Sequence, residues 1–227
     1  MDSSQERRDK RFYGIIAIVI IILIILTVIF SSNKITKAII DDSVLNNGWS
    51  EDISERFYAE RLFGLEKQAS FTYKINNDTY PAYVSVTTIK TLFMMDESDL
   101  LDQTIKTIKM ETNNLGINLN STSKISGNRV LNNEHTTNYV IYNGTDNSKN
   151  LSEEIKIIGE AWNCALSGTS IICIGFAQVT DNSDGNAVEF LDNWARIIKD
   201  KTDTFANIYN SNTFIGSNGL IFNVICD

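Results

Sequence analysis

The chain has little of several residue types on which predictions of function usually depend: one proline, one histidine and three cysteines among 227 residues. So few prolines exclude a proline-rich linker or stalk, and internal repeats and low-complexity tracts are not apparent, so we expect a compact fold. One histidine and three scattered cysteines fit a zinc site poorly, because such a site needs several of these ligands close together. The sequence therefore predicts no metal site and no cofactor.

Charged side chains are absent from the apolar run Gly14–Phe30. As a helix its 17 residues would span about 26 Å, close to the roughly 30 Å hydrocarbon core of a bilayer. The run is longer than the apolar core of a secretory signal, which favours an uncleaved anchor, with a removed signal peptide as the alternative. A cytoplasmic N-terminus is favoured by the basic residues before the run, which are Arg7, Arg8, Lys10 and Arg11.

The anchor sets the expected domain boundaries. They are a cytoplasmic tail at 1–13, a transmembrane helix at 14–32, a juxtamembrane helix and linker at 33–65, an extracytoplasmic domain at 66–205 and a C-terminal tail at 206–227 with an edge strand over Leu220–Cys226. We therefore expect a single-pass protein of the plasma membrane, which contacts the membrane through residues 14–30 and carries its C-terminal domain outside the cytoplasm.

The net charge of −8 is unevenly divided, with +1 on residues 1–13 and −9 on residues 31–227. An acidic domain repels phosphate backbones, so a nucleic-acid partner is disfavoured. It also repels anionic lipid headgroups. The expected partner of the domain is therefore another protein of the cell envelope.

Periodicity predicts the elements of this domain. Apolar Phe71, Tyr73 and Ile75 alternate with polar residues, and the β-branched stretch 82–91 follows a polar turn, which together predict a hairpin. A helix is expected after the N-cap residue Ser98. The apolar face of this helix consists of Leu101, Ile105, Ile108 and Thr112. The helix is expected to end at Gly116.

The second half of the domain is expected to contain more strand than helix. Strands are predicted near 117–125, 136–142, 154–163 and 170–179, and a last helix is predicted from the spacing of Ala187, Leu191, Trp194, Ala195 and Ile198. This order predicts an α+β fold in which one central antiparallel sheet is covered by two main helices.

Two of the three cysteines lie on either side of one predicted turn. A loop of residues 167–170 would put Cys164 directly opposite Cys173, within the Cα separation that a disulfide accepts. A two-residue turn at Ser167 and Gly168 would offset them instead, and two buried thiols are the alternative to the bond. Cys226 is either a third buried thiol or a link to a second chain in a homodimer.

A catalytic constellation is not apparent. His135, which follows Glu134, is the only base available to a Ser/His/Asp or Cys/His mechanism, and the sequence has no G-x-S-x-G motif. The acidic residues are adjacent in sequence rather than facing one another. No catalytic residue is therefore assigned, and the enzymatic alternative is an envelope hydrolase or metal-dependent enzyme that uses His135 with Glu134 or nearby acids.

Four N-x-S/T sequons fall in predicted turns or loops. Glycosylation there would suit an extracytoplasmic domain, although several matches are expected by chance in a chain so rich in asparagine. The acceptor residues would be Asn77, Asn120, Asn143 and Asn150.

Two resemblances follow from longer stretches of sequence. The segments 159–164 (GEAWNC) and 167–175 (SGTSIICIG), with Trp194 and 197–200 (IIKD), resemble uncharacterised single-pass envelope proteins of archaea, mainly methanogens. With Phe71–Tyr73 and Tyr80–Tyr83, the order of strands and helices resembles the PsbP-like α/β/α sandwich. PsbP-like domains are generally non-enzymatic modules that dock onto or help to assemble membrane complexes, so the resemblance implies binding. We therefore expect a membrane-anchored extracytoplasmic binding or assembly module.

Overall fold

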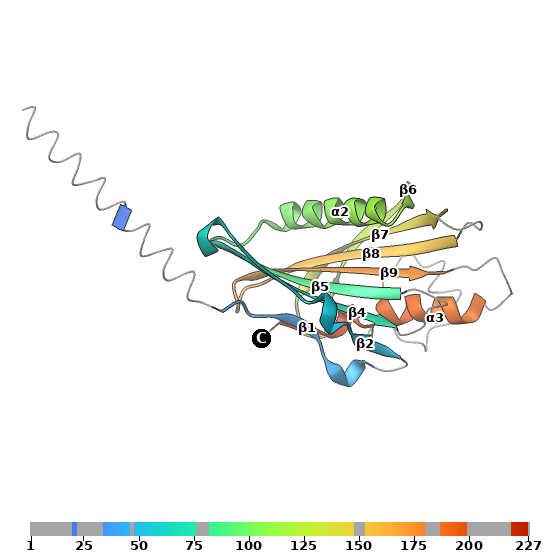
Figure 1. The fold of residues 1–227 in the computed structure, drawn as a ribbon, viewed down its shortest axis with the longest axis horizontal. Coiled ribbons are helices and arrows are strands. Elements are labelled where there is room, and N and C mark those ends of the chain that lie inside the picture. The colour runs from blue at the N-terminus through green and yellow to red at the C-terminus, as the bar shows by residue number, and fades with distance from the viewer. Residues whose placement is uncertain are drawn as a thin grey trace, which may run out of the picture.

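The computed structural model describes residues 20–21, 34–45, 48–75, 82–147, 153–179, 187–198 and 219–226, and the statements below concern these residues. Their main feature is one large antiparallel sheet (Figure 1). Its strands lie in the order β2-β4-β5-β9-β8-β7-β6, and β3 also pairs with β4. They are β2 (Trp49–Glu51), β3 (Phe57–Arg61), β4 (Glu66–Ile75), β5 (Ala82–Thr91), β6 (Ile117–Val130), β7 (Thr136–Asp146), β8 (Glu153–Cys164) and β9 (Thr169–Gln178).

Burial along the strands explains their different sequences. In β4 and β5, buried residues such as Phe71 and Val86 alternate with partly exposed hydroxyl residues, as expected when one face of a sheet is covered. Strands β8 and β9 lie at the centre of the sheet and are buried along almost their whole length. Their near-continuous apolar runs, Ile155–Ile158 and Ile171–Ile174, follow from burial on both faces.

Helix α2 (Glu97–Asn114) covers one face of the sheet over β6 to β9. It begins at Asp96, whose carboxylate accepts a hydrogen bond from the Ser98 amide at 2.9 Å. The helix approaches β8 closely at Gly159, where a Cβ atom would lie 2.5 Å from Cγ2 of Thr104 and 2.7 Å from Cδ1 of Ile108. Glycine at position 159 therefore sets the distance between the helix and the sheet.

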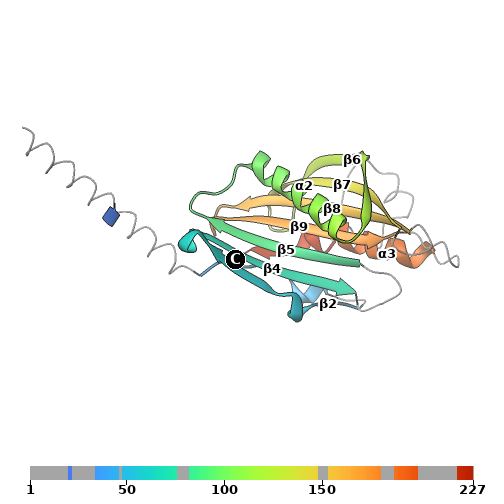
Figure 2. The same ribbon diagram turned by 45° about the horizontal axis from the view of Figure 1, so that its top comes forward.

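A second layer covers the opposite face, as Figure 2 shows. It consists of helix α3 (Ala187–Ile198) and a small antiparallel sheet formed by β1 (Ala38–Ile40) and β10 (Val224–Cys226). Two hydrogen bonds fix β1 to the large sheet: the Ala38 amide donates to Oγ1 of Thr88 at 2.8 Å, and the Ile40 amide donates to the Tyr73 hydroxyl at 3.0 Å.

A buried ion pair lies on this second face. The Arg129 guanidinium contacts both carboxylate oxygens of Glu160, with Nε–Oε1 at 2.8 Å and Nη2–Oε2 at 2.6 Å. The Thr137 hydroxyl donates to the same carboxylate, and Arg129 Nη1 donates to the Ile198 carbonyl at 3.2 Å, at the end of α3. The pair therefore ties three neighbouring strands to the last turn of α3.

The expected fold class, an α+β sandwich covered by two main helices, is wrong. The described chain is mostly strand, and apart from the helical residues Ile20 and Ile21 its α-helices are α2 and α3. Two helices are too few to cover a sheet of this width. Part of the second face is instead covered by β1 and β10.

The predicted transmembrane helix is a second correction. Nowhere in the described ranges is a helix both long enough and apolar enough to cross a membrane, which overturns the expectation of a single-pass protein of the plasma membrane. Helix α3 has 12 residues, against the roughly 20 that a span requires, and α2 carries charged residues along its length. Within the predicted span, the structure describes Ile20 and Ile21, and the other residues of 14–32 and the tail 1–13 lie outside the described ranges.

The segment predicted as a juxtamembrane helix and linker is also different. Residues 33–65 contain β1, β2 and β3, joined by short 3-10 turns, and two of these strands pair with β4. The domain that contains the sheet therefore includes residues assigned from the sequence to the linker. The edge strand expected over Leu220–Cys226 corresponds to β10, which begins at Val224 and pairs with β1.

Candidate functional site

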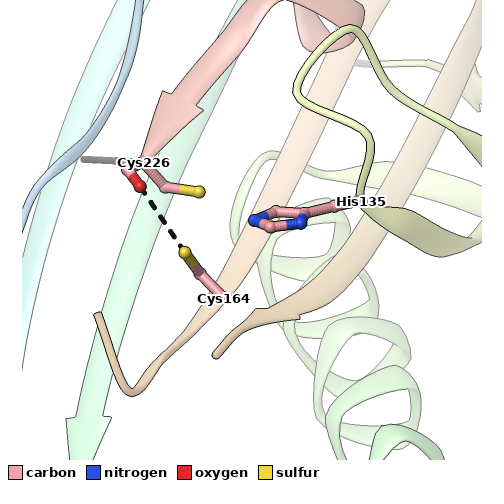
Figure 3. Close-up of side chains that lie close together, drawn as sticks. All are labelled: His135, Cys164 and Cys226. Atoms are coloured by element: carbon pink, nitrogen blue, oxygen red, sulfur yellow. Dashed lines mark hydrogen bonds between the residues drawn. The ribbon is translucent and has the colours of Figure 1, made fainter. Parts of the chain in front are cut away.

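Three side chains that can bind metals meet at one end of the second layer (Figure 3). His135 follows the turn between β6 and β7, Cys164 is the last residue of β8, and Cys226 is the last residue of β10. The imidazole nitrogen and the two sulfur atoms all lie within 4.8 Å of one another. We call these three residues the Cys2His cluster.

The turn before His135 has a defined geometry. The Leu131 amide donates to the His135 carbonyl at 3.0 Å, and the Glu134 amide donates to the Leu131 carbonyl at 3.0 Å. Glu134 has a positive φ of 64°. Because this conformation is uncommon outside glycine, the surrounding hydrogen bonds must hold the turn in place.

Two asparagines join this turn to the C-terminal segment. The Asn132 amide donates to the Phe222 carbonyl at 3.1 Å, and the side-chain amide of Asn133 donates to the Val224 carbonyl at 2.9 Å. The same amide nitrogen lies 3.9 Å from the sulfur of Cys226, and Asn133 Oδ1 accepts from the His135 amide at 3.2 Å. Asn133 therefore positions both His135 and Cys226.

Cys164 is completely buried, with an exposed fraction of 0%. Its thiol donates to the Cys226 carbonyl at 3.5 Å, the contact drawn as a dashed line in Figure 3. Burial raises the pKa of this thiol, but hydrogen bonds with Ser167, Cys226 and His135 outweigh burial and lower the pKa to about 7. The thiol of Cys164 is therefore more acidic than an ordinary cysteine.

The geometry of the cluster suits a small tetrahedral ion. Because the three ligand atoms lie within 4.8 Å of one another, a central point exists that is no more than about 2.8 Å from each of them, whereas zinc bonds measure about 2.3 Å to sulfur and 2.0–2.1 Å to nitrogen. Closing this difference requires each side chain to move by less than about 1 Å. Three protein ligands would leave a fourth position for water or another ligand.

The structure does not bring the predicted disulfide pair together. In the β8–β9 hairpin, Cys164 lies opposite Thr169 and Cys173 lies opposite Glu160. The loop is therefore 165–168, and Gly168 takes a positive φ of 63° at its last position. Four residues along a strand separate Cys173 from the level of Cys164, about 13 Å. The three cysteines are buried, and the structure joins no two of them in a disulfide.

Cys173 is in a different environment from the cluster. It packs beside the buried ion pair, where burial and the negative charge of Glu160 raise its pKa well above the usual value. A thiol in this environment is unreactive, so Cys173 is the natural control for experiments on the other two cysteines.

The structure describes two of the four sequon asparagines. Asn120 is exposed but lies within the span of β6, where its side chain accepts from the amide and hydroxyl of Thr122 at 3.0 and 2.7 Å. Asn143 is half-buried in β7. Asn77 and Asn150 fall outside the described residues, so glycosylation of the four positions stays a prediction.

A groove of about 860 Å³ lies on the other face of the large sheet. Side chains of α2, β3, β4, β5 and β9 line it, and they combine apolar and charged groups with neutral hydrogen-bonding groups such as Gln68, Ser70, Thr87 and Gln103. Because the Cys2His cluster belongs to the opposite face, the groove and the cluster are separate features.

Comparison with known proteins gives no relative: no family model, curated protein or solved structure matches this chain. The resemblances to archaeal envelope proteins and to the PsbP-like sandwich therefore stay predictions. What the chain does has to be inferred from the geometry of its own residues.

Proposed function

We propose that this protein is a metal-binding module in which Cys164, Cys226 and His135 hold one thiophilic divalent ion of the zinc class. The observation that carries this proposal is the convergence of two thiols and one imidazole from three remote segments within 4.8 Å. From the sequence, we expected no metal site, because the histidine and the cysteines are far apart along the chain. The proposal differs from that expectation because the fold brings three of these residues together.

The donor set determines the class of ion. Thiolate and imidazole ligands suit zinc and related transition metals, whereas calcium and magnesium require oxygen ligands. Asn133 would act as an outer-shell partner, because its side chain contacts the backbone of the ligand His135 and the backbone of Val224, two residues before the ligand Cys226. Partners of this kind fix the orientation of the ligands.

A bound ion would cross-link the β6–β7 turn, the end of β8 and the last strand. Such a cross-link is the usual role of a structural zinc, and it suits a binding or assembly module with a protein partner, as proposed from the sequence. We do not carry the membrane anchor into this proposal.

The fourth coordination position supports a second candidate function. Catalytic zinc sites use three protein ligands, Cys2His among them, and keep one position for water. A metal-dependent hydrolase is therefore the alternative, with one change from the hypothesis based on the sequence: His135 would act as a ligand beside two thiols rather than with Glu134 or other acids.

The test is metal titration of the full chain after reduction and removal of metals by a chelator. We expect one zinc ion per chain by elemental analysis, and thiolate-to-metal charge-transfer absorption when cobalt(II) replaces zinc. C164A, C226A and H135A should each lose the tightly bound ion. C173A removes a thiol outside the cluster and should retain it.

Two results would overturn the proposal. One is a reduced wild-type chain that binds no stoichiometric zinc or cobalt. The other is undiminished binding by the C164A/C226A double variant, which would place the ion elsewhere. Circular dichroism of each variant separates a lost ligand from a lost fold.

A further inference from the structure

The two sulfurs of the Cys2His cluster also form a pair of thiols that lie close enough to react with each other. Cys164 and Cys226 have their sulfur atoms within 4.8 Å, while Cys173 is about 13 Å along the strand from the level of Cys164. A tetrahedral zinc would hold the two sulfurs about 3.8 Å apart, and a disulfide would bring them to about 2.05 Å. The metal-bound and disulfide-bonded forms therefore exclude each other.

We propose that oxidation of Cys164 and Cys226 to a disulfide expels the metal ion, so that the cluster is a redox-controlled metal site. This inference rests on the proposed metal-binding function. The regulated event is the exchange of two metal–sulfur bonds for one sulfur–sulfur bond, and His135 alone does not retain the ion.

The step balances with a peroxide as oxidant. One thiolate attacks a peroxide oxygen, the O–O bond breaks, and the cysteine becomes a sulfenic acid. The second sulfur attacks the sulfenic sulfur and releases water. With hydrogen peroxide, the two thiolates lose two electrons, two protons are taken up, and the products are the disulfide, two molecules of water and the free ion.

The positions of the two cysteines permit this approach. Cys226 is 9% exposed and ends a strand of three residues, and the β10 register places it opposite Ala38 alone. Cys164 is the last residue of β8, directly before a loop whose Leu166 is 97% exposed. Both sulfurs are carried by the last residues of their strands.

The disulfide would preserve the attachment of the last strand. In the metal-bound form the ion links β10 to β8, and in the oxidised form the Cys164–Cys226 bond links the same two strands. Oxidation would therefore release the ion without releasing the strand. This distinguishes the proposed control from general oxidative unfolding, which would free both.

The experiment uses the full chain loaded with zinc and treated with hydrogen peroxide in the presence of a chromogenic zinc indicator. Disulfide connectivity is followed by peptide mass mapping. We expect about one zinc released per chain, in step with the Cys164–Cys226 linked peptide, and zinc uptake again after reduction. C173A should behave as the wild type, and far-ultraviolet circular dichroism should change little during release.

The possible results separate this inference from the proposed function. If the chain binds one zinc but peroxide yields no Cys164–Cys226 peptide, or releases zinc only as the fold is lost, the redox control is wrong and metal binding stands. If the reduced chain takes up no zinc, the proposed function fails, and control of a metal fails with it.

Discussion

Asn133 offers the sharpest test of how the Cys2His cluster is built. Replacing it with alanine removes the bond from its amide to the Val224 carbonyl at 2.9 Å and the bond from the His135 amide to its Oδ1 at 3.2 Å. None of the three proposed metal ligands is changed by this substitution. A loss of affinity would therefore report on the positioning of the ligands alone.

The magnitude follows from these two contacts. A hydrogen bond of this kind contributes about 1 kcal/mol, so the loss of both should cost about 2 kcal/mol. If the cost falls on the conformation that binds metal, the zinc dissociation constant rises about 30-fold, because each 1.4 kcal/mol corresponds to about tenfold. This value lies within the 10–100-fold typical of outer-shell substitutions.

The neighbouring residue gives a matched control. In N132A the backbone amide of residue 132 still donates to the Phe222 carbonyl, and the variant loses only an exposed side-chain contact to Asn223 at 3.4 Å. We expect N132A to bind zinc within about twofold of the wild type, since exposed contacts of this kind contribute little. Competition with a fluorescent chelator measures both constants. Equal affinities in N133A and N132A would refute the reasoning.

Three further predictions concern the sheet and its surface. E160A should lower the free energy of unfolding by about 3–5 kcal/mol in urea titrations, because it leaves Arg129 buried without its partner. G159A should cost about 1–3 kcal/mol in the same assay, because the added Cβ would overlap the side chains of α2. Hydrogen bonds from Lys74 and Ser54 lower the pKa of Asp52 to about 2. The stability that the ionised carboxylate provides is thus complete above about pH 4 and is lost as the pH falls toward 2. In acid titrations followed by circular dichroism, the stability of D52N should therefore depend less on pH than that of the wild type. The same pH dependence in both proteins would contradict this prediction.

Local patterns in the sequence predicted strands β4 to β9 of the large sheet and the two helices, but not strands β2 and β3. The alternation of Phe71, Tyr73 and Ile75 corresponds to the end of β4, and the stretch 82–91 corresponds to β5. The apolar stripe from Leu101 to Thr112 lies within α2, and the spacing from Ala187 to Ile198 gives α3. These features are set by neighbours within a few residues, which a periodicity can detect.

The small sheet of the second layer could not be predicted in the same way. Strand β1 has three residues and pairs with β10, almost the whole length of the chain away. A pairing of this kind leaves no local period. From the sequence, the apolar residues of β1 were therefore assigned to the predicted juxtamembrane helix. The layer that β1 and β10 form was not expected, and the fold was wrongly predicted as a sandwich covered by helices alone.

The Cys2His cluster was missed for a related reason. Its three ligands come from the β6–β7 turn, the end of β8 and the end of β10, so no fixed spacing identifies them. The register of one hairpin also mattered. Gly168 takes a positive φ at the last position of the loop, as glycine readily does. With this loop, Cys164 pairs with Thr169 rather than with Cys173. A glycine at that position was the available signal.

The pairing of β1 with β10 also has a consequence for the order of folding. Contacts between residues so distant in sequence close a very large loop, and their entropic cost is recovered only once other contacts have formed. We therefore expect the hairpins β4–β5 and β8–β9 to form early and the β1–β10 pair to form last. The Cys2His cluster would then be completed at the end of folding. A metal ion that binds there would stabilise a domain that has already folded rather than nucleate its folding.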